Sequence, residues 1–505
     1  MTAPSPDEAR EFLRTFRSFL EWVHQPEDRA HPVASLLRGH LGDRGEAQSV
    51  VTASLPAFEH VNLQVALDAW TAEPGRTVRV KGLSMPPHFG GISLSQLLHG
   101  TGLPPVTLSA PDVVDLPSGP GRTHGCWNLA LLLVEDARGR GVLLVAGPQR
   151  HEEPRLVVEV AGLATGAAQE VLRELAELRD RLDVYRGQVV ELRPGPAGPT
   201  LVFAELPPTG RDDVVLPEDV LRRVERHTLD VARQRDRLRA TGRHLKRGLL
   251  LYGPPGTGKT HTTRYLVQAL QGTTVLLLSG SALMMIGAVA DLARKLQPSV
   301  VVLEDVDLVA EDRSFGPGSS PVLFELLDAM DGSAADADLL FLLTTNRADL
   351  LEPALAARPG RVDVAVEIGL PDDEARRRLL EVHGRGLVLD LSEDDLRDAV
   401  ERTHGVTASF LKELLRRAVL EALEGAVGPD SDPPTVTGAH LSRALDDLLD
   451  ASQSVTRALL GVPADQNGPP SPPVPDFWPG GRMSRGVVYG GSYGPGLVEE
   501  YVEYD

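Results

Sequence analysis

The sequence has a single cysteine, Cys126, few aromatic residues (4%) and no apolar run long enough to cross a membrane. One cysteine cannot form a disulfide within the chain, which is compatible with a reducing compartment. We interpret Cys126, beside Trp127, as a core residue. Because the start of the sequence also lacks a basic and then apolar signal, we expect a cytoplasmic protein without a membrane partner.

Basic residues are also scarce relative to acidic ones. The 505 residues include 51 Lys and Arg against 71 Asp and Glu, which gives a formal net charge of −20. A nucleic-acid partner requires a basic face, so the composition argues against general DNA or RNA binding. The length allows about two to four domains, and the 42% hydrophobic content is ordinary for a soluble protein.

A glycine-rich stretch near the middle of the chain is the strongest local signal. It reads Gly253-Pro254-Pro255-Gly256-Thr257-Gly258-Lys259-Thr260, followed by His261. An apolar run ending at Tyr252 precedes it and a helical pattern follows, so backbone N–H groups and a helix N-terminus can surround a phosphate. In this Walker A pattern Lys259 reaches the β- and γ-phosphates, and the Thr260 hydroxyl can hold Mg²⁺. Residues 253–261 are therefore predicted to bind ATP with Mg²⁺.

In two further places polar residues directly follow an apolar run, as the glycine-rich stretch does. Glu304 and Asp305 come directly after the run that starts at Val300, and Asn346 comes after Thr344 and Thr345. Adjacent carboxylates after a buried strand are typical of a Walker B motif. We assign Glu304 to Mg²⁺ through water, Asp305 to the attacking water as base, and Asn346 to the positioning of that water.

Guanidinium groups precede the last strand candidate. Arg358 and Arg361 belong to the segment Arg358-Pro359-Gly360-Arg361. Such groups can stabilise the charge of a transferring phosphoryl group. We therefore include both arginines among the catalytic candidates.

The order of patterns along the chain predicts an α/β fold. Strand candidates near 248–252, 274–278, 300–304, 339–344 and 362–368 are mostly continuous apolar runs, as expected for a parallel sheet buried on both faces. We predict five segments: an α+β N-terminal region of unknown function (1–205), a linker with a leading helix (206–246), a P-loop NTPase sheet domain (247–370), a helical lid (371–450), and a Pro/Gly-rich disordered tail (451–505).

Residues from about 214 to 450 resemble the AAA module, named for ATPases associated with diverse cellular activities. The segment from Thr344 to Leu355, continued by Arg358 to Asp363, resembles the second region of homology of that family. The resemblance implies an ATP hydrolase that assembles as a ring, commonly a hexamer, and acts on a protein client. It also implies that Asn346 is the sensor-1 residue and that both arginines reach the ATP site of the neighbouring subunit.

The chain departs from the family pattern in three places. Glu304 precedes Asp305, where the family usually has Asp and then Glu; the mitochondrial Bcs1-like branch is similar in this respect. The lid segment Gly405–Ser409 matches only part of the family's adenosine-contacting motif. In the loop Gly280–Gly287 a methionine occupies the position where protein-threading members carry an aromatic residue. Met285 and Ile286 can grip a polypeptide or simply pack the loop, and the sequence leaves both alternatives open.

Three functions follow from these observations. The leading hypothesis is a ring-forming ATPase that remodels a client selected by residues 1–205. The rival is an ATP-dependent switch or scaffold that recruits a partner with little turnover, which the unusual Walker B order and the missing aromatic favour. The Arg-rich stretch 222–247 suggests a DNA-acting motor, which the acidity of the chain opposes.

Overall fold

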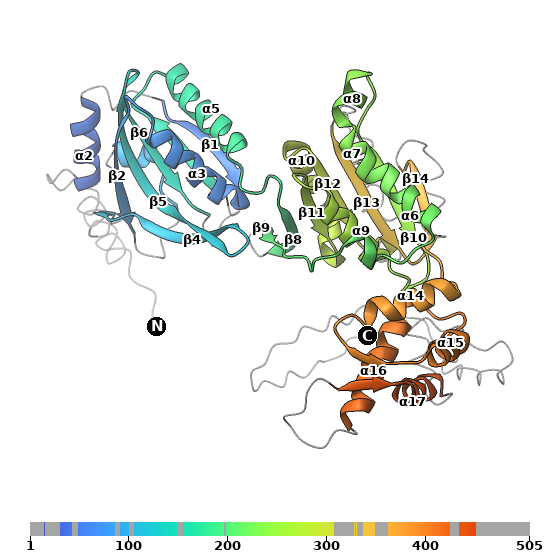
Figure 1. The fold of residues 1–505 in the computed structure, drawn as a ribbon. Helices are drawn as coiled ribbons and strands as arrows, with labels where there is room; N and C mark the ends of the chain where they lie inside the picture. Colours follow the sequence, from blue (N-terminus) through green and yellow to red (C-terminus); the bar gives the residue numbers. More distant parts are fainter. Residues whose placement is uncertain are drawn as a thin grey trace, which may run out of the picture. The chain divides into compact units, whose positions relative to one another are not determined.

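The computed structural model describes residues 31–42, 49–85, 91–99, 106–148, 155–195, 198–307, 337–348, 362–424 and 434–450, with isolated positions at 15, 328 and 330. Figure 1 shows the N-terminal sheet in blue and cyan, the second sheet in green and yellow, and a helical part in orange and red. Phe12, Phe16, Phe19, Leu20 and Val23 recur at helical spacing and predict a short amphipathic helix. This helix and the predicted disordered tail, 451–505, lie outside the described residues.

The N-terminal sheet is antiparallel, with the strand order β1-β7-β6-β5-β2-β3 and with β4 paired to β5. Its longest strand, β5, alternates between the two faces: Leu132 and Val134 contact one core cluster, whereas Leu131 and Leu133 contact the other. Both faces of the sheet are therefore buried at this central stretch of β5. The strands are β1 (Val51–Pro56), β2 (Thr77–Ser84), β3 (Thr107–Ser109), β4 (Asp112–Gly119), β5 (Arg122–Asp136), β6 (Gly139–Ala146) and β7 (Arg155–Ala161).

Helices cover both faces of this sheet. Residues of α3 (His60–Thr71) and α5 (Thr165–Arg181) pack on the face of Leu132, and residues of α2 (Pro32–Leu41) and α4 (Leu94–His99) pack on the opposite face. The apolar runs 129–134 and 141–145 around a polar turn predict a hairpin, which β5 and β6 form, with Glu135 paired to Arg140 beside the turn. The charge pattern of residues 166–185 predicts a helix, and the observed helix ends earlier, at Arg181.

The second sheet has the order β14-β10-β13-β12-β11-β8-β9, in which all neighbouring pairs are parallel except β8 with β9. Its strands β12 and β13 are buried along their whole length, because one cluster packs on each face. The α/β fold predicted for this part of the chain is confirmed. The strands are β8 (Val189–Gly195), β9 (Gly198–Phe203), β10 (Arg247–Tyr252), β11 (Thr274–Leu278), β12 (Ser299–Leu303), β13 (Leu339–Thr345) and β14 (Val364–Glu367).

The hairpin β8–β9 differs from the sequence-based division at residue 205. We predicted it as part of the N-terminal region, but β8 pairs in parallel with β11 of the nucleotide-binding sheet, with Val189 opposite Val275. Without this pairing β11 would expose a row of backbone N–H and C=O groups along an edge. The hairpin therefore belongs, by its hydrogen bonds, to the second sheet.

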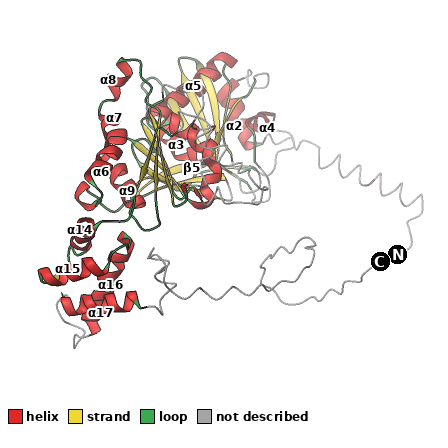
Figure 2. Cartoon of the chain, turned by 90° about the vertical axis from the view of Figure 1, so that its right-hand side faces the viewer, coloured by secondary structure: helices red, strands yellow, loops and turns green. Residues whose placement is uncertain are grey.

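Helices on the two faces of the second sheet hold the loops that follow its strands. α9 (Lys259–Ala269) and α6 (Glu218–Glu225) pack on one face, and α10 (Ile286–Lys295) packs on the other. The predicted basic leading helix is in fact a succession of α6, a π-helical turn (Arg226–Asp230), α7 (Val231–Arg233) and α8 (Arg235–Ala240) (Figure 2).

The lid contains the helices that the sequence predicts. They are α14 (Asp373–His383), α15 (Glu393–Arg402), α16 (Ala408–Glu424) and α17 (Gly438–Leu449), with a short parallel pair of β15 (Val388–Asp390) and β16 (Thr435–Thr437). Capping side chains start two of them: Asp372 accepts a hydrogen bond from the Ala375 N–H, and Ser392 forms a capping box with Asp395.

A charged cluster at the end of α10 includes residues from before β8. The Lys295 ammonium lies 2.7 Å from Glu59 Oε1 and 3.6 Å from Asp183 Oδ2, and these two carboxylate side chains are only 6% and 0% exposed. Arg186 donates hydrogen bonds to the Lys295 and Gln297 carbonyls at 3.2 and 2.7 Å. Burial would lower the pKa of Lys295, but the interaction with Glu59 raises it. Lys295, together with Arg179 at 3.6 Å from Glu59 Oε2, thus supplies the compensating charge for these buried carboxylates.

Candidate functional site

The glycine-rich loop joins β10 to α9, which is the predicted strand–loop–helix arrangement. Its glycines are required by geometry: Gly253, Gly256 and Gly258 all have positive φ, at 145°, 78° and 108°. A Cβ on Gly253 would lie 2.2 Å from the Ile368 carbonyl oxygen. Glycine at this position therefore lets the loop pass close to the backbone that follows β14.

Lys259 lies at the start of α9, inside this loop. Its side chain donates hydrogen bonds to the Gly253 and Pro254 carbonyls, both at 2.8 Å, and the residue is only 6% exposed. Burial lowers the pKa of the ammonium group, while Asp305 and Asp307 act in the opposite direction. A buried cation surrounded by backbone groups fits the phosphates of a nucleotide.

The ends of two neighbouring strands bring the predicted base and sensor together. Asp305 follows β12 and Asn346 follows β13, and the Asn346 amide donates to Asp305 Oδ1 at 3.4 Å. Asp305 has a positive φ of 53°, a conformation that Asp tolerates better than most residues, and its N–H donates to Thr344 Oγ1. Since β12 and β13 are parallel, their carboxyl ends meet at the edge where the loop also lies.

Asp307 is a further carboxylate at this edge to which sequence reasoning assigned no role. Its Oδ1 accepts hydrogen bonds from Thr345 Oγ1 at 3.0 Å and from the Asn346 N–H at 3.2 Å. The residue is 7% exposed. Asp307 therefore holds the segment that carries Asn346, and it is a positioning residue.

Glu304 lies beside the Thr260 hydroxyl, as expected for the two predicted Mg²⁺ ligands. Burial raises the pKa of Glu304, as does the neighbouring Asp305, whereas Arg264 and a hydrogen bond with Thr260 lower it. A hydroxyl and a carboxylate are oxygen ligands of the kind that Mg²⁺ takes together with substrate phosphates. The residues present therefore fit Mg²⁺ with ATP.

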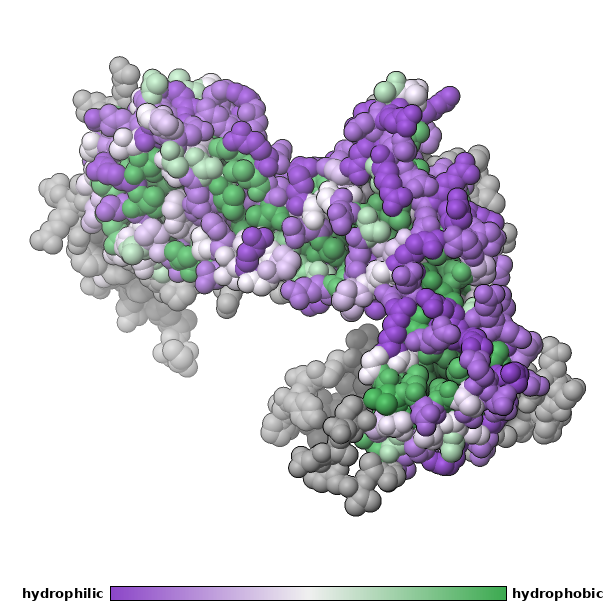
Figure 3. Space-filling view, viewed as in Figure 1, coloured by the Kyte–Doolittle hydropathy of each residue, from purple (hydrophilic) through white to green (hydrophobic). Residues whose placement is uncertain are grey.

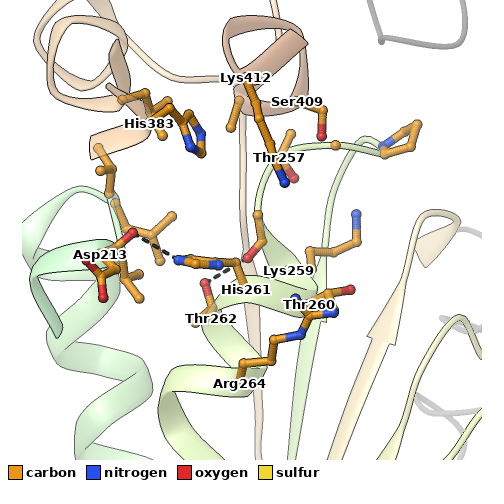
Figure 4. A pocket seen from close by; sticks show the side chains of 18 of the residues that line it. Asp213, Thr257, Lys259, Thr260, His261, Thr262, Arg264, His383, Ser409 and Lys412 are labelled. Carbon is orange, nitrogen blue, oxygen red and sulfur yellow. Dashed lines mark hydrogen bonds between the residues drawn. The ribbon is translucent and has the colours of Figure 1, made fainter. Parts of the chain in front are cut away.

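The loop and the lid border a pocket of about 460 Å³ (Figure 4). His261 Nε2 is hydrogen-bonded to the Asp213 carbonyl at 3.0 Å, which ties α9 to the segment before α6. From the lid, burial lowers the pKa of His383 to about 4, with smaller contributions from Lys412 and His261. The lining residues not predicted from the sequence include Asp213, Arg264, Leu379, His383 and Lys412.

These residues carry no sequence signal of their own, because a lone histidine or lysine in a helix is usually a surface or core residue. The partial lid motif was a usable signal. The Ser409 N–H donates to the Gly256 carbonyl at 3.0 Å, so this motif contacts the phosphate loop directly. The lid residues thus become part of the site through long-range contacts, which also include the ion pair of Arg385 with Asp213.

Arg358 and Arg361 lie outside the described residues, so their role at a neighbouring subunit stays a prediction.

In the loop after β11, Ile286 is fully buried and Met285 packs against the core, whereas Met284 is 49% exposed. Of the two roles weighed for Met285 and Ile286, the geometry is that of packing.

A parallel sheet with a phosphate loop at its carboxyl edge, faced by a helical lid, defines a P-loop nucleotide-binding protein. The family described as the ATPase family associated with various cellular activities (AAA) matches residues 249–370. The chain therefore contains an AAA domain, in agreement with the resemblance noted from the sequence, and proteins of this class use ATP with Mg²⁺.

Relatives with the same domain include proteases and a cell-division protein. The ATP-dependent zinc metalloprotease FtsH 1 of Sphaerobacter thermophilus is 33% identical over 238 residues, 44% of this chain and 35% of that protein. The ATP-dependent zinc metalloprotease FtsH 3 of Sorangium cellulosum is 37% identical over 238 residues, 44% and 38% respectively. The cell division cycle protein 48 homolog of Archaeoglobus fulgidus is 35% identical over 189 residues, 35% and 25% respectively. The chain thus spans between a quarter and two fifths of the length of these relatives.

Two features bear on the comparison with the zinc proteases. Among the described residues, no group of three or more His, Cys, Asp or Glu side chains is placed to hold a metal ion. The sequence also lacks the His-Glu-x-x-His pattern of zinc-protease helices.

In the part of the chain that the structure describes, no helix combines the length and the apolar character that a membrane span requires.

Proposed function

We propose that this chain is a Mg²⁺-dependent ATP hydrolase that assembles into a ring and remodels a protein client.

 The observation that carries this proposal is the convergence of Asp305 and Asn346, 3.4 Å apart, on the pocket that also contains Lys259. A carboxylate and an amide that share one water can orient it and take its proton. Relatives named as ATP-dependent proteins support ATP as the nucleotide.

The proposed mechanism gives each residue of the chain one task. Lys259 and the loop N–H groups bind the phosphates. Thr260, and Glu304 through water, would hold Mg²⁺, which would supply positive charge to offset that of the phosphates. Asn346 orients the attacking water and Asp305 accepts its proton. Glu304 is one methylene longer than the usual aspartate at its position, and Asp305 one shorter than the usual glutamate. A water molecule can span either difference, so turnover is expected, at a modest rate.

The proposal extends to assembly, because Arg358 and Arg361 are expected to complete the site of a neighbouring copy. Activity should then rise with protein concentration. We further propose that the chain forms a ring, commonly a hexamer, and that residues 1–205 select the client. We expect the protein to act in the cytoplasm. The exposed Met284 is the residue of the loop after β11 best placed to touch a client.

Steady-state phosphate release tests the proposed hydrolysis. Lys259→Ala should abolish ATP binding, and Asp305→Asn should lower kcat by about 10²- to 10⁴-fold while ATP still binds. Arg416→Gln, which removes an exposed cation of the lid outside the pocket, is the matched control. Unchanged rates in the Lys259 and Asp305 variants would show that the assigned site is wrong.

A nucleotide-dependent switch is the second candidate. The burial of Ile286 and the packing of Met285 favour it, because they leave the loop after β11 with little apolar surface for pulling a polypeptide. Partner capture should be compared in ATP, in a slowly hydrolysed analogue and in the Asp305→Asn variant. Capture that needs binding but no turnover would establish the switch.

A further inference from the structure

A pocket of about 630 Å³ lies on the N-terminal sheet, in a part of the chain that the proposed mechanism does not use. Its floor is formed where α2 and α4 leave the sheet uncovered, and Ser54, Val157 and Ala146 are paired there across β1, β7 and β6. Residues 91–93, which precede α4, form a wall. A cavity of this size is large enough to bind a small molecule or the side chain of another protein.

Glu159 is the acidic residue among the described residues that line this pocket. It lies on β7 two residues after Val157, so both side chains are on the same face of the sheet. Glu159 is only 9% exposed, and its Oε2 accepts a hydrogen bond from the Leu94 N–H. Within the described ranges, Oε1 has neither a hydrogen bond nor an ion pair, and it is not fully enclosed by protein. One oxygen of this largely buried carboxylate therefore remains open to a ligand in the pocket.

The surroundings of Glu159 favour a cationic ligand. The lining includes the buried side chains of Leu144, which is paired with Glu159, and Ile92. A carboxylate beside apolar side chains gives up part of its hydration, and a paired cation offsets that cost. Arg155, the basic residue among the described lining residues, lies four residues before Glu159 on β7, has an interaction of its own and forms no ion pair with Glu159 in the described structure. The compensating charge is therefore left to a ligand.

We propose that this pocket binds a lysine or arginine side chain of the protein client. The inference rests on the proposed function, because it takes residues 1–205 as the region that selects the client. The apolar stem of such a side chain would contact Val157 and Ala146, and its charged head would pair with Glu159 Oε1. The net charge of −20 would in addition attract basic segments to the chain from a distance.

Fluorescence anisotropy of short labelled peptides, titrated with the full chain, tests this inference. The peptides consist of alanine and leucine, are acetylated at the N-terminus, and carry at the centre either lysine or norleucine, which lacks only the ammonium group. The lysine peptide should bind about tenfold more tightly than the norleucine peptide, and added salt should reduce the difference. Glu159→Gln keeps an acceptor for the Leu94 N–H and removes the charge, so this variant should bind both peptides equally within about twofold.

A second variant leaves Glu159 in place and fills the pocket. Ser54→Trp, at an exposed position of β1, should weaken binding of the lysine peptide about tenfold. Thr107→Trp, at an exposed position of β3 on the opposite edge of the sheet, is the matched control for the added ring. Glu177→Gln, on α5 at the other face of the sheet, is the control for the lost charge. Both controls should bind the lysine peptide like the unmodified chain.

Three results would overturn the inference. They are equal binding of the lysine and norleucine peptides by the unmodified chain, a lysine preference that survives in Glu159→Gln, and unchanged binding in Ser54→Trp. A peptide with a free N-terminal amine and no lysine is a further probe, and its tighter binding would assign the pocket to chain ends instead. Phosphate release that is lost in Lys259→Ala and Asp305→Asn would support the proposed hydrolysis in all these cases, so failure of the pocket and failure of the ATPase are distinguishable.

Discussion

Both sheets contain a central strand that is buried on both faces, but the candidate site lies at an edge of the parallel sheet. In the parallel sheet, β10, β12 and β13 all end at the same edge, and the residues that follow them meet there. In the antiparallel N-terminal sheet, neighbouring strands end at opposite edges, so polar residues after successive strands are separated. The comparison shows how strand direction, more than burial, gathers catalytic residues.

The same comparison qualifies a rule for reading strands. A continuous apolar run is expected of a strand in a parallel sheet, and β12 and β13 fit this expectation. The segment Leu129–Val134 of β5 is equally continuous and buried, but it is antiparallel to both of its neighbours. Such a run therefore indicates burial of both faces and does not determine strand direction.

The exposed parts of the described chain are largely hydrophilic in the view of Figure 3.

We expect the largest loss of unfolding free energy from cavity-forming substitutions, one in each sheet. Together they test whether the N-terminal sheet supports the nucleotide site. Leu132 and Leu342 are fully buried leucines, one in each sheet. Replacing either by Ala should cost about 2–5 kcal/mol of unfolding free energy, because a buried cavity is left. Urea unfolding gives the cost, and labelled-ATP titration gives the effect on the site.

We expect Leu342→Ala to weaken ATP binding and Leu132→Ala to leave it unchanged within about twofold. The matched pair differs only in the sheet that carries the cavity. Equal weakening of ATP binding by both substitutions would break the comparison, since the N-terminal sheet would then support the site directly.

A smaller loss of unfolding free energy is expected when the charged cluster at the end of α10 loses its lysine. Lys295→Met removes the cation near Glu59 and Asp183 and leaves two buried carboxylates without it. The loss of unfolding free energy should be about 2–4 kcal/mol at neutral pH. Lys81→Met, at an exposed position of β2, is the control and should change stability by less than about 0.5 kcal/mol. A loss of the same small size in both variants would contradict the assigned role of the cluster.

The smallest expected effect is a fall in stability at low pH that arises from His383 in the lid. The pKa of His383 is lowered from 6.5 to about 4 by burial, so the folded state holds this histidine neutral. Between pH 6.5 and about pH 4 the unfolded chain binds a proton that the folded chain does not, so stability falls as the pH falls through this window. Allowing for solvent screening at this partly exposed site, the loss is about 1–2 kcal/mol.

Urea unfolding of the nucleotide-free protein at about pH 7.5 and about pH 4.5 measures this contribution. His383→Asn should reduce the difference in stability between the two pH values. His404→Asn, at an exposed position of the same lid, is the control and should keep the full difference. If the two variants have the same pH dependence, His383 does not carry the effect.

The sequence predicts the parts of the site that are contiguous in the chain. The loop from Gly253 to Thr260, the carboxylates Glu304 and Asp305, and Asn346 each follow their own apolar strand, so short-range patterns locate them. The four lid helices are likewise marked by their periodicity and, for α14 and α15, by capping residues. Local steric and hydrogen-bonding preferences are sufficient for these features.

Only the tertiary structure decides which distant segments meet. The pairing of β8 with β11, the packing of Met285 and Ile286, and the approach of Ser409 to Gly256 all join residues through packing and backbone hydrogen bonds between elements. Such contacts depend on the free energy of the whole assembled core, which no window of sequence contains. His383 and Lys412 therefore reach the phosphate loop because the lid folds onto it, although nothing in their own neighbourhood marks them.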